Sequence, residues 1–191
     1  IADAMAKDVG DFDRRRALQA SINTANVNYF DGLGDYIEYK FVADDKSHSS
    51  VSKTLEYAYN DWCIAQMAKI VGDDSIEEEF LKRAEYYKNV FDTKTGYMRP
   101  KLSDGTFRKN FDPMDTHGQG FIEGNAWNYG LYVPQNIDKM ISMMGGNEQF
   151  SQHLDSLFTM QIEDKYITKH EDITRDGIIG NYVHGNEPGH H

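Results

Sequence analysis

The stretch from Val51 to Val71 constrains the fold more than any other part of this sequence. Ser49 and Ser50 are available as N-caps before it, and Gly72 is a natural residue for its end. Apolar or small side chains recur along it with the i, i+4, i+7 spacing of one buried helical face, at Val51, Leu55, Ala58, Trp62 and Ala65. This pattern predicts a long helix over 51–71 that packs one face against a core.

A second helix follows closely in the sequence. Ser75 is the expected N-cap, and Glu78 three residues later completes a capping box. The stripe that this helix is expected to bury consists of Phe80, Ala84, Tyr87 and Phe91.

The rest of the chain alternates between helical patterns and turn signals. The region 92–113 carries Gly, Asp and Ser turn signals around short apolar pieces, which favours a small hairpin or an ordered loop. The C-terminal stretch is rich in glycine and is expected to be loop. Further helices are predicted over about 12–26 and 122–132, after Pro134, and after Asn147 as an N-cap, with a weakly helical start over 1–7.

These elements predict an all-α fold, because no alternation of strands and helices is visible. The helices fit either a bundle or part of an α/α toroid, and periodicity alone does not separate the two. The length of 191 residues favours a single all-α segment over 1–191.

Composition narrows the range of partners. The net charge is −11, which argues against nucleic acid or an anionic membrane surface, because both require a concentrated cationic face. Aromatic residues make up 13% of the chain, so there is enough bulky surface to bury in a core. No apolar run approaches the length of about 20 residues that spans a bilayer, so no membrane insertion is expected. The single cysteine, Cys63, cannot form an internal disulfide.

The segment from Phe121 to Tyr129 is the first candidate for chemistry. Glu123 stands next to Gly124 among Phe121, Ile122 and Trp127, and we expect these neighbours to desolvate it partly. A carboxyl group against aromatic surface has a raised pKa and is suited to act as a general acid. The alternative is an acidic residue that the helix dipole favours near a helix N-terminus.

The C-terminal stretch, residues 178–191, is the second candidate, because it concentrates oxygen and imidazole groups in a glycine-flanked loop. Asparagine and glutamate oxygens suit a hard cation such as calcium. A zinc site on His184, Glu187 and His190 is an alternative, although the spacing is not that of the helical two-histidine motif. A polar loop that ends in a purification remnant, His190-His191, is the third interpretation. A weaker signal is His170-Glu171, which suits either a sugar contact or a solvated charged turn.

Several of these segments together resemble one known family. Ser50–Ala65 is similar to a signature of glycoside hydrolase family 92, the bacterial, calcium-dependent, exo-acting α-mannosidases. The resemblance extends from about Gly32 to the end of the chain. It is carried further by Tyr87–Asp92, Gly96–Arg99, the Glu-Gly-Asn-Ala-Trp run Glu123–Trp127 and the terminal His184–His191, where Gly189 stands in place of an expected serine.

The resemblance implies a fold and a location. The family's catalytic domain is an (α/α)6 barrel preceded by a β-sandwich domain, and this chain resembles only the middle of the barrel. We therefore expect an incomplete (α/α)6 toroid of helical hairpins, with His190-His191 as native sequence. The family also implies a periplasmic or secreted protein.

The resemblance also implies roles for individual residues. Glu123 takes the place of the family's general acid, and Asn186 and Glu187 become the candidate ligands of calcium. The pair His170-Glu171 resembles the aglycone-side pair of members that prefer α-1,2 linkages. Together with that pair, Trp127 and His184 are the expected contacts with the mannose-containing glycan.

The family inverts the anomeric centre, so it uses a second carboxylate as a base. None of Asp164, Asp172 or Asp176 matches that base, which is expected beyond His191. The isolated chain is accordingly expected to be inactive and to self-associate through the open edges of its toroid. The alternative is a non-catalytic helical module that binds glycans or proteins and keeps the motifs as structure.

Overall fold

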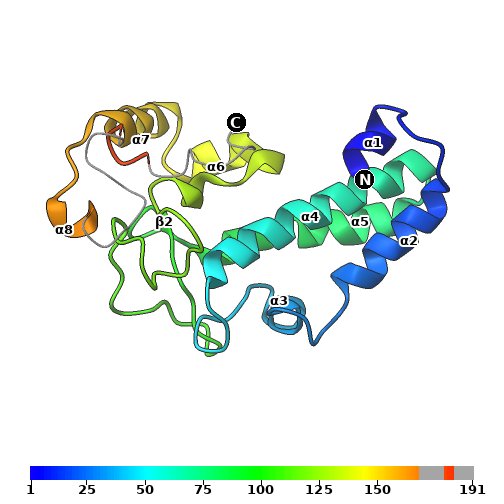
Figure 1. Cartoon of the computed structure of the whole chain (residues 1–191), viewed down its shortest axis with the longest axis horizontal. Coiled ribbons are helices and arrows are strands. Elements are labelled where there is room, and N and C mark those ends of the chain that lie inside the picture. Colours follow the sequence, from blue (N-terminus) through cyan, green and yellow to red (C-terminus); the bar gives the residue numbers. More distant parts are fainter. Residues whose placement is uncertain (168–178, 183–191) are drawn as a thin grey trace.

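The computed structural model describes residues 1–167 and 179–182, and this part of the chain is mostly helical, as predicted (Figure 1). The only paired strands in the described residues form a two-stranded hairpin. None of the helices found there is long and apolar enough to cross a membrane. The elements are α1 Ala2–Ala6, α2 Arg14–Ala25, α3 Leu33–Tyr39, α4 Ser50–Val71, α5 Asp74–Arg83, η1 Tyr86–Val90, β1 Phe91–Asp92, β2 Tyr97–Met98, η2 Tyr129–Leu131, η3 Pro134–Asn136, α6 Ile137–Met143, α7 Asn147–Thr159 and α8 Asp164–Ile167.

The central element is α4, which confirms the predicted long helix. It ends as expected at Gly72, whose φ of 74° lets its N–H reach back to the carbonyls of the last turn. Its start differs from the prediction, because the Ser49 side chain makes no capping hydrogen bond. The carbonyl of Gly120 instead accepts hydrogen bonds from the backbone N–H groups of Val51 (2.8 Å) and Ser52 (3.2 Å). A distant loop therefore caps the helix.

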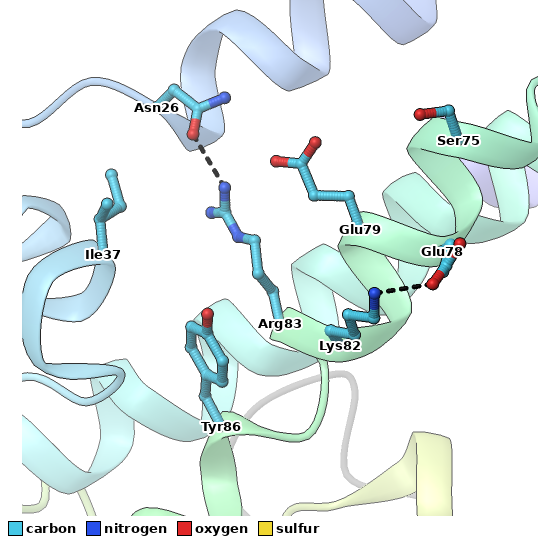
Figure 2. Close-up of a pocket in the computed structure, with 8 residues that line it drawn as sticks. All are labelled: Asn26, Ile37, Ser75, Glu78, Glu79, Lys82, Arg83 and Tyr86. Carbon is cyan, nitrogen blue, oxygen red and sulfur yellow. Dashed lines mark hydrogen bonds and ion pairs between the residues drawn. The ribbon is translucent and has the colours of Figure 1, made fainter.

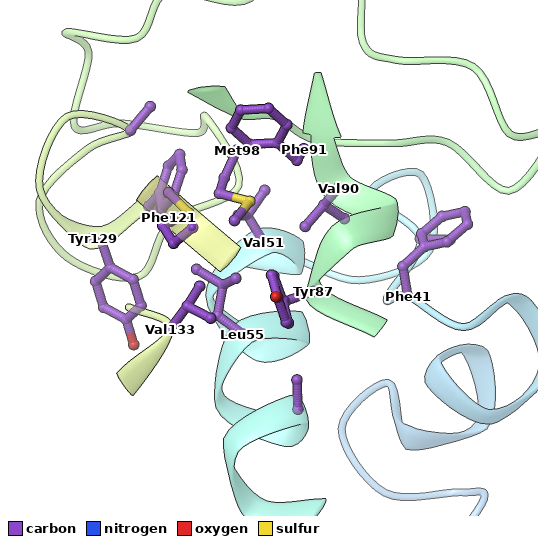
Figure 3. Close-up of a cluster of buried hydrophobic side chains, with 14 residues drawn as sticks. Phe41, Val51, Leu55, Tyr87, Val90, Phe91, Met98, Phe121, Tyr129 and Val133 are labelled. Atoms are coloured by element: carbon purple, nitrogen blue, oxygen red, sulfur yellow. The ribbon is translucent and has the colours of Figure 1, made fainter. Parts of the chain in front are cut away.

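Two hydrophobic clusters lie along α4. The first surrounds its N-terminal half, where Val51 and Leu55 pack against Tyr87 and the hairpin (Figure 3). The second surrounds its C-terminal half, where α1, α2 and α5 gather (Figure 1). The buried members of the second cluster are Met5, Leu18, Ile64, Ala65, Met67, Ala68 and Phe80.

Helix α5 returns antiparallel alongside α4, but its cap is not the predicted one. Asp73 is the N-cap, and its carboxylate accepts a hydrogen bond from the N–H of Ile76 (3.2 Å). Glu78 pairs with Lys82 (2.7 Å) in place of closing a capping box with Ser75. The predicted stripe is buried throughout, although only its first members lie on or at the end of α5, because the chain continues as η1 and β1.

The region after α5 forms the small hairpin that the sequence predicted. Strand β1 pairs with β2 in antiparallel register, with Phe91 opposite Met98, and Gly96 adopts a φ of 77° in the turn. A further bridge between Lys101 and Phe107 extends the ordered loop.

The predicted helix over 122–132 is wrong, because only η2 is helical there. The helix expected after Pro134 is present as η3 and α6, and α7 begins at Asn147 with Gly146 as its N-cap. The short helices α3 and α8 were not predicted.

A buried cluster of polar side chains connects α3 to α4 and α5. Arg83 Nε contacts Asp61 Oδ2 at 3.0 Å, and the Tyr36 hydroxyl donates to the same oxygen at 2.8 Å. Burial raises the pKa of Asp61 to about 6. The guanidinium also donates to Asn26 Oδ1 (2.8 Å) at the end of α2, at the edge of a cavity of about 480 Å³ (Figure 2). Because Arg83 is held by partners within the chain, we assign this cluster a structural role.

Candidate active site

The segment that carries Glu123 is fastened at its N-terminal end to the start of α4. Besides the two hydrogen bonds to the Gly120 carbonyl, the N–H of Ile122 donates to Ser52 Oγ (3.1 Å). The contact is so close that a Cβ atom on Gly120 would lie 2.7 Å from Pro100 Cγ and 2.9 Å from Val51 Cγ2. Gly120 also has a φ of 84°, so glycine is required both by its conformation and by the space available.

A buried asparagine fastens the middle of the segment. Asn125 is fully buried, and its side-chain NH2 donates to the Met114 carbonyl (3.1 Å) and to Asn181 Oδ1 (3.0 Å). Its Oδ1 accepts hydrogen bonds from the N–H of Trp127 (3.0 Å) and from Asn128 Nδ2 (3.1 Å). Both donors and both acceptor positions of this amide are filled, as a buried polar group requires.

Two further asparagines complete the cluster. Asn128 Oδ1 accepts from the N–H groups of Asn125 (3.1 Å) and Tyr129 (2.8 Å), and its Nδ2 donates to the Asn181 carbonyl (2.9 Å). Asn181 is buried in the turn 179–182, and its N–H donates to the carbonyl of Leu157 in α7 (2.7 Å). We call Asn125, Asn128 and Asn181 the asparagine cluster. It explains why no helix forms at 122–128, because side-chain amides take N–H groups that a helix would use.

Glu123 does not lie in the apolar surroundings that its sequence neighbours suggested. Its side chain is exposed, and Ile122 beside it is 62% exposed. The aromatic neighbours face elsewhere, because Phe121 is buried in the first hydrophobic cluster and Trp127 packs against other rings. Gly124 follows with a φ of 59°. The expectation of partial desolvation is therefore wrong for Glu123 in this chain.

Trp127 is half-buried between side chains from two other elements. Its indole stacks on the imidazole of His153 from α7, with ring centroids 4.4 Å apart and planes 15° apart, and Tyr97 of β2 lies 5.5 Å away. The His153 Nε2–H donates to the Trp127 carbonyl (3.0 Å), and burial lowers the pKa of His153. One face of the indole is therefore covered within the chain.

The remaining site predictions lie outside the described residues, and they are His170, Glu171, His184, Asn186, Glu187 and His190. Within residues 1–167 and 179–182, no group of three or more His, Cys, Asp or Glu side chains is placed to hold a metal ion. Sequence reasoning missed His153, Asn128 and Asn181. The spacing of Asn125 and Asn128 in a glycine-containing segment and the place of Asn181 in the candidate stretch 178–191 were the available signals, and nothing near His153 indicated its part.

Comparison with known proteins places this helical chain among the glycoside hydrolases. Residues 1–191 match the glycosyl hydrolase family 92 catalytic domain, and the chain belongs to that family. The chain is 41% identical to the solved family GH92 α-mannosidase BT3965 from Bacteroides thetaiotaomicron, with a TM-score of 0.86 over 97% of this chain and 24% of that one. The same α-mannosidase in complex with mannoimidazole gives 39% identity and a TM-score of 0.86, over 98% of this chain and 25% of that one.

Two other proteins are similar over most of the chain. The inverting mannosidase BT2199 from the same organism is 30% identical, with a TM-score of 0.79 over 88% of this chain and 24% of that one. An uncharacterized secreted glycosidase of Arthroderma benhamiae is 26% identical over 85% of this chain and 26% of its own length. The chain thus spans about a quarter of each relative. Its helices form part of an (α/α) toroid, as the resemblance implied.

Proposed function

We propose that the polypeptide to which this chain belongs is an exo-acting α-mannosidase that removes α-linked mannose from glycans. The observation that carries this proposal is the close superposition on a solved α-mannosidase over nearly the whole chain. The complex of that neighbour with mannoimidazole supports a mannose-containing glycan as the substrate.

Glu123 is the proposed general acid, which protonates the departing glycosidic oxygen. Its exposed side chain is open to a substrate, while the backbone on either side of it is held by α4 and by the asparagine cluster. In an inverting reaction a second carboxylate activates water on the opposite face of the sugar, about 6.5–9.5 Å from the acid. The proposed base belongs to a part of the catalytic domain outside this chain. The inverting mannosidase among the neighbours supports this stereochemistry.

The proposed contacts with the glycan are Trp127, His170, Glu171 and His184, with His170-Glu171 on the aglycone side favouring α-1,2 linkages. Only Trp127 belongs to the described residues. Because His153 covers one of its faces, a sugar would meet the opposite face or the edge of the indole.

Calcium is the proposed cofactor, with Asn186 and Glu187 as ligands, because amide and carboxylate oxygens suit a hard cation. When bound, the ion would orient sugar hydroxyl groups. A periplasmic or secreted location is proposed, and the relative described as a secreted glycosidase supports it.

The isolated chain is expected to show no mannosidase turnover, because the proposed base is not part of it. Its self-association is also proposed. An apolar groove of about 840 Å³ between α1, α2 and α4, lined in part by Ala2, Ala20 and Trp62, supports this proposal.

The decisive test substitutes Glu123 in the full-length polypeptide. Glu123→Gln should lower kcat by about 10²–10⁴-fold on α-mannosides with poor leaving groups, because the proton that the acid supplies is lost. A mannoside with an activated phenol leaving group should lose far less, since it needs little protonation. Glu148→Gln, an exposed carboxylate on α7, is the matched control and should leave both rates unchanged. Equal losses on both substrates would remove Glu123 from the role of acid.

Chelation tests the cofactor separately. Treatment of the full-length polypeptide with a calcium chelator should abolish mannosidase activity, and added Ca²⁺ should restore it. Activity that survives chelation would refute the calcium proposal and leave the α-mannosidase proposal standing. Metal analysis that finds stoichiometric zinc would favour the site on His184, Glu187 and His190 instead.

A further inference from the structure

We infer that the amide of Asn128 positions Glu123 by fastening the segment 121–129 to the turn 179–182. The inference rests on the proposed role of Glu123 as the general acid. Asn128 is a positioning residue in this account, because it acts through the backbone that carries Glu123.

The two ends of the Asn128 amide perform different tasks. Its Oδ1 accepts two N–H groups of its own segment, from Asn125 (3.1 Å) and Tyr129 (2.8 Å), which is an ordinary local cap. Its Nδ2 instead donates to the Asn181 carbonyl (2.9 Å) and to Asn125 Oδ1 (3.1 Å). The oxygen thus contacts only its own segment, while the nitrogen bonds both to Asn125 in that segment and to Asn181 in another part of the chain.

The segment depends on such links because it has no regular structure before η2. Gly120 and Ile122 are hydrogen-bonded to the start of α4, and Asn125 and Asn128 are hydrogen-bonded to Asn181 of the turn. Glu123 lies between these two attachments. Release of either one would let the backbone at Glu123 move, and a misplacement of about 1 Å can reduce a rate about 10²-fold.

The link continues beyond the turn. The N–H of Asn181 donates to the Leu157 carbonyl (2.7 Å), and Gly180 approaches the backbone of Leu157 so closely that a Cβ atom would lie 2.2 Å from that carbonyl oxygen. The turn 179–182 therefore packs directly against the backbone of α7. His153 of α7 also stacks on Trp127, so the segment is joined to α7 by two routes.

A pair of substitutions separates the two tasks of the amide. Asn128→Asp keeps the oxygen that caps Asn125 and Tyr129, but it replaces the NH2 donor with a second oxygen that faces two acceptors. Asn128→Ala removes both the capping oxygen and the NH2 donor. If Asn128 only caps its segment, the aspartate should restore what the alanine loses. If it positions Glu123 through Asn181, both variants should be impaired.

The kinetic arm uses the full-length polypeptide. We expect both variants to lower kcat about 10–100-fold on a poor leaving group, with a small change in KM, because the acid is displaced while sugar contacts persist. The activated aryl mannoside should be affected less. Asn147→Ala, an exposed asparagine at the start of α7, is the matched control and should behave as wild type. Wild-type kinetics for Asn128→Asp would overturn the inference.

The second arm needs no activity. Hydrogen exchange at single amides should show faster exchange at Trp127, whose acceptor is Asn125 Oδ1, in both variants. The Asn125 amide should stay protected in Asn128→Asp and lose protection in Asn128→Ala, because only the aspartate keeps the oxygen that accepts from its N–H. Unchanged protection at Trp127 in Asn128→Asp would overturn the inference.

The arms separate this inference from the proposed function. If Glu123→Gln shows no dependence on the leaving group, the proposed role of Glu123 as the general acid fails, while the exchange pattern still decides whether Asn128 links the segment to the turn. If Asn128→Asp does not fold, Asn128→Ser serves in its place. Serine keeps a hydroxyl oxygen of the kind that caps N–H groups, and it has no NH2 group to donate to the Asn181 carbonyl. It should be impaired in the same way, and wild-type kinetics for it would overturn the inference.

Discussion

The His153 imidazole covers one face of the Trp127 indole and donates to the carbonyl of the same residue. Burial lowers the pKa of His153, because it disfavours the charged imidazolium in the folded protein. Between that lowered pKa and the ordinary value of about 6.5, the unfolded chain binds more protons than the folded one. The free energy of unfolding that His153 contributes is therefore complete above about pH 6.5 and is lost as the pH falls through the folded value.

The corresponding measurement compares urea unfolding at pH 7.5 and at pH 5.5. In the 191-residue chain, a Trp62→Phe background leaves Trp127 as the fluorescent probe. We expect the free energy of unfolding to fall more steeply with acid in this protein than in the same background with His153→Phe, which keeps a ring but cannot titrate. Parallel pH profiles for the two would show that His153 does not contribute.

At the scale of single residues, the choice of Glu123 as the acid stays a prediction, and the surroundings expected for it are wrong. Glu123 stood out because its segment breaks the helical pattern and matches the family motif. Whether its aromatic neighbours face it depends on where each of them packs. Phe121 packs in the first hydrophobic cluster, and Trp127 stacks on His153 of α7, which comes later in the chain. Such long-range contacts leave no local pattern to read.

At the scale of elements, prediction succeeded where one period repeats over many turns. Helix α4 forms over the predicted span, and Gly72 marks its end by a purely local conformation. The predicted single buried face is wrong in part, because residues 50–55 are all buried and Trp62 is only half-buried. Its start could not be predicted, because the capping carbonyl belongs to Gly120. Helices α3 and α8 are too short for a period to appear. The segment 122–128 looked helical, but asparagine side chains compete there for the backbone donors.

The cap on α4 leads to a prediction about glycine. Gly120 and Gly105 share a φ of 84°, yet only Gly120 is crowded, since nothing lies within 4 Å of a Cβ built on Gly105. Gly105→Ala should lower the free energy of unfolding by about 1–2 kcal/mol through its backbone conformation alone. Gly120→Ala should cost clearly more, because Pro100 and Val51 must move and the cap must loosen. Chemical unfolding of both variants measures the difference, and equal losses would mean that the crowded neighbours adapt freely.

At the scale of the whole molecule, α4 is shared by two hydrophobic clusters. It is about 33 Å long at 1.5 Å per residue, with the hairpin and the Glu123 segment at one end and α1 and α2 at the other (Figure 1). Neither cluster can lose α4 and remain packed. The described part of the chain should therefore unfold as one cooperative unit.

This cooperativity is measurable with two probes. Trp127 fluorescence in the Trp62→Phe background reports on the segment near the site, and far-UV circular dichroism reports on the helices. The two denaturant transitions should coincide, as a two-state process requires. Separated midpoints would show that the clusters are independent despite the shared helix.

Because α4 is shared, substitutions in the second hydrophobic cluster and in the asparagine cluster should give different phenotypes in a living cell. Substitutions in the second cluster, such as at Leu18 or Phe80, lie far from Glu123 and act only by lowering the fraction of folded molecules. They should behave as temperature-sensitive alleles, in which the protein that does fold turns over at the normal rate. Substitutions in the asparagine cluster should instead behave as alleles defective at every temperature, because the folded molecules themselves are impaired.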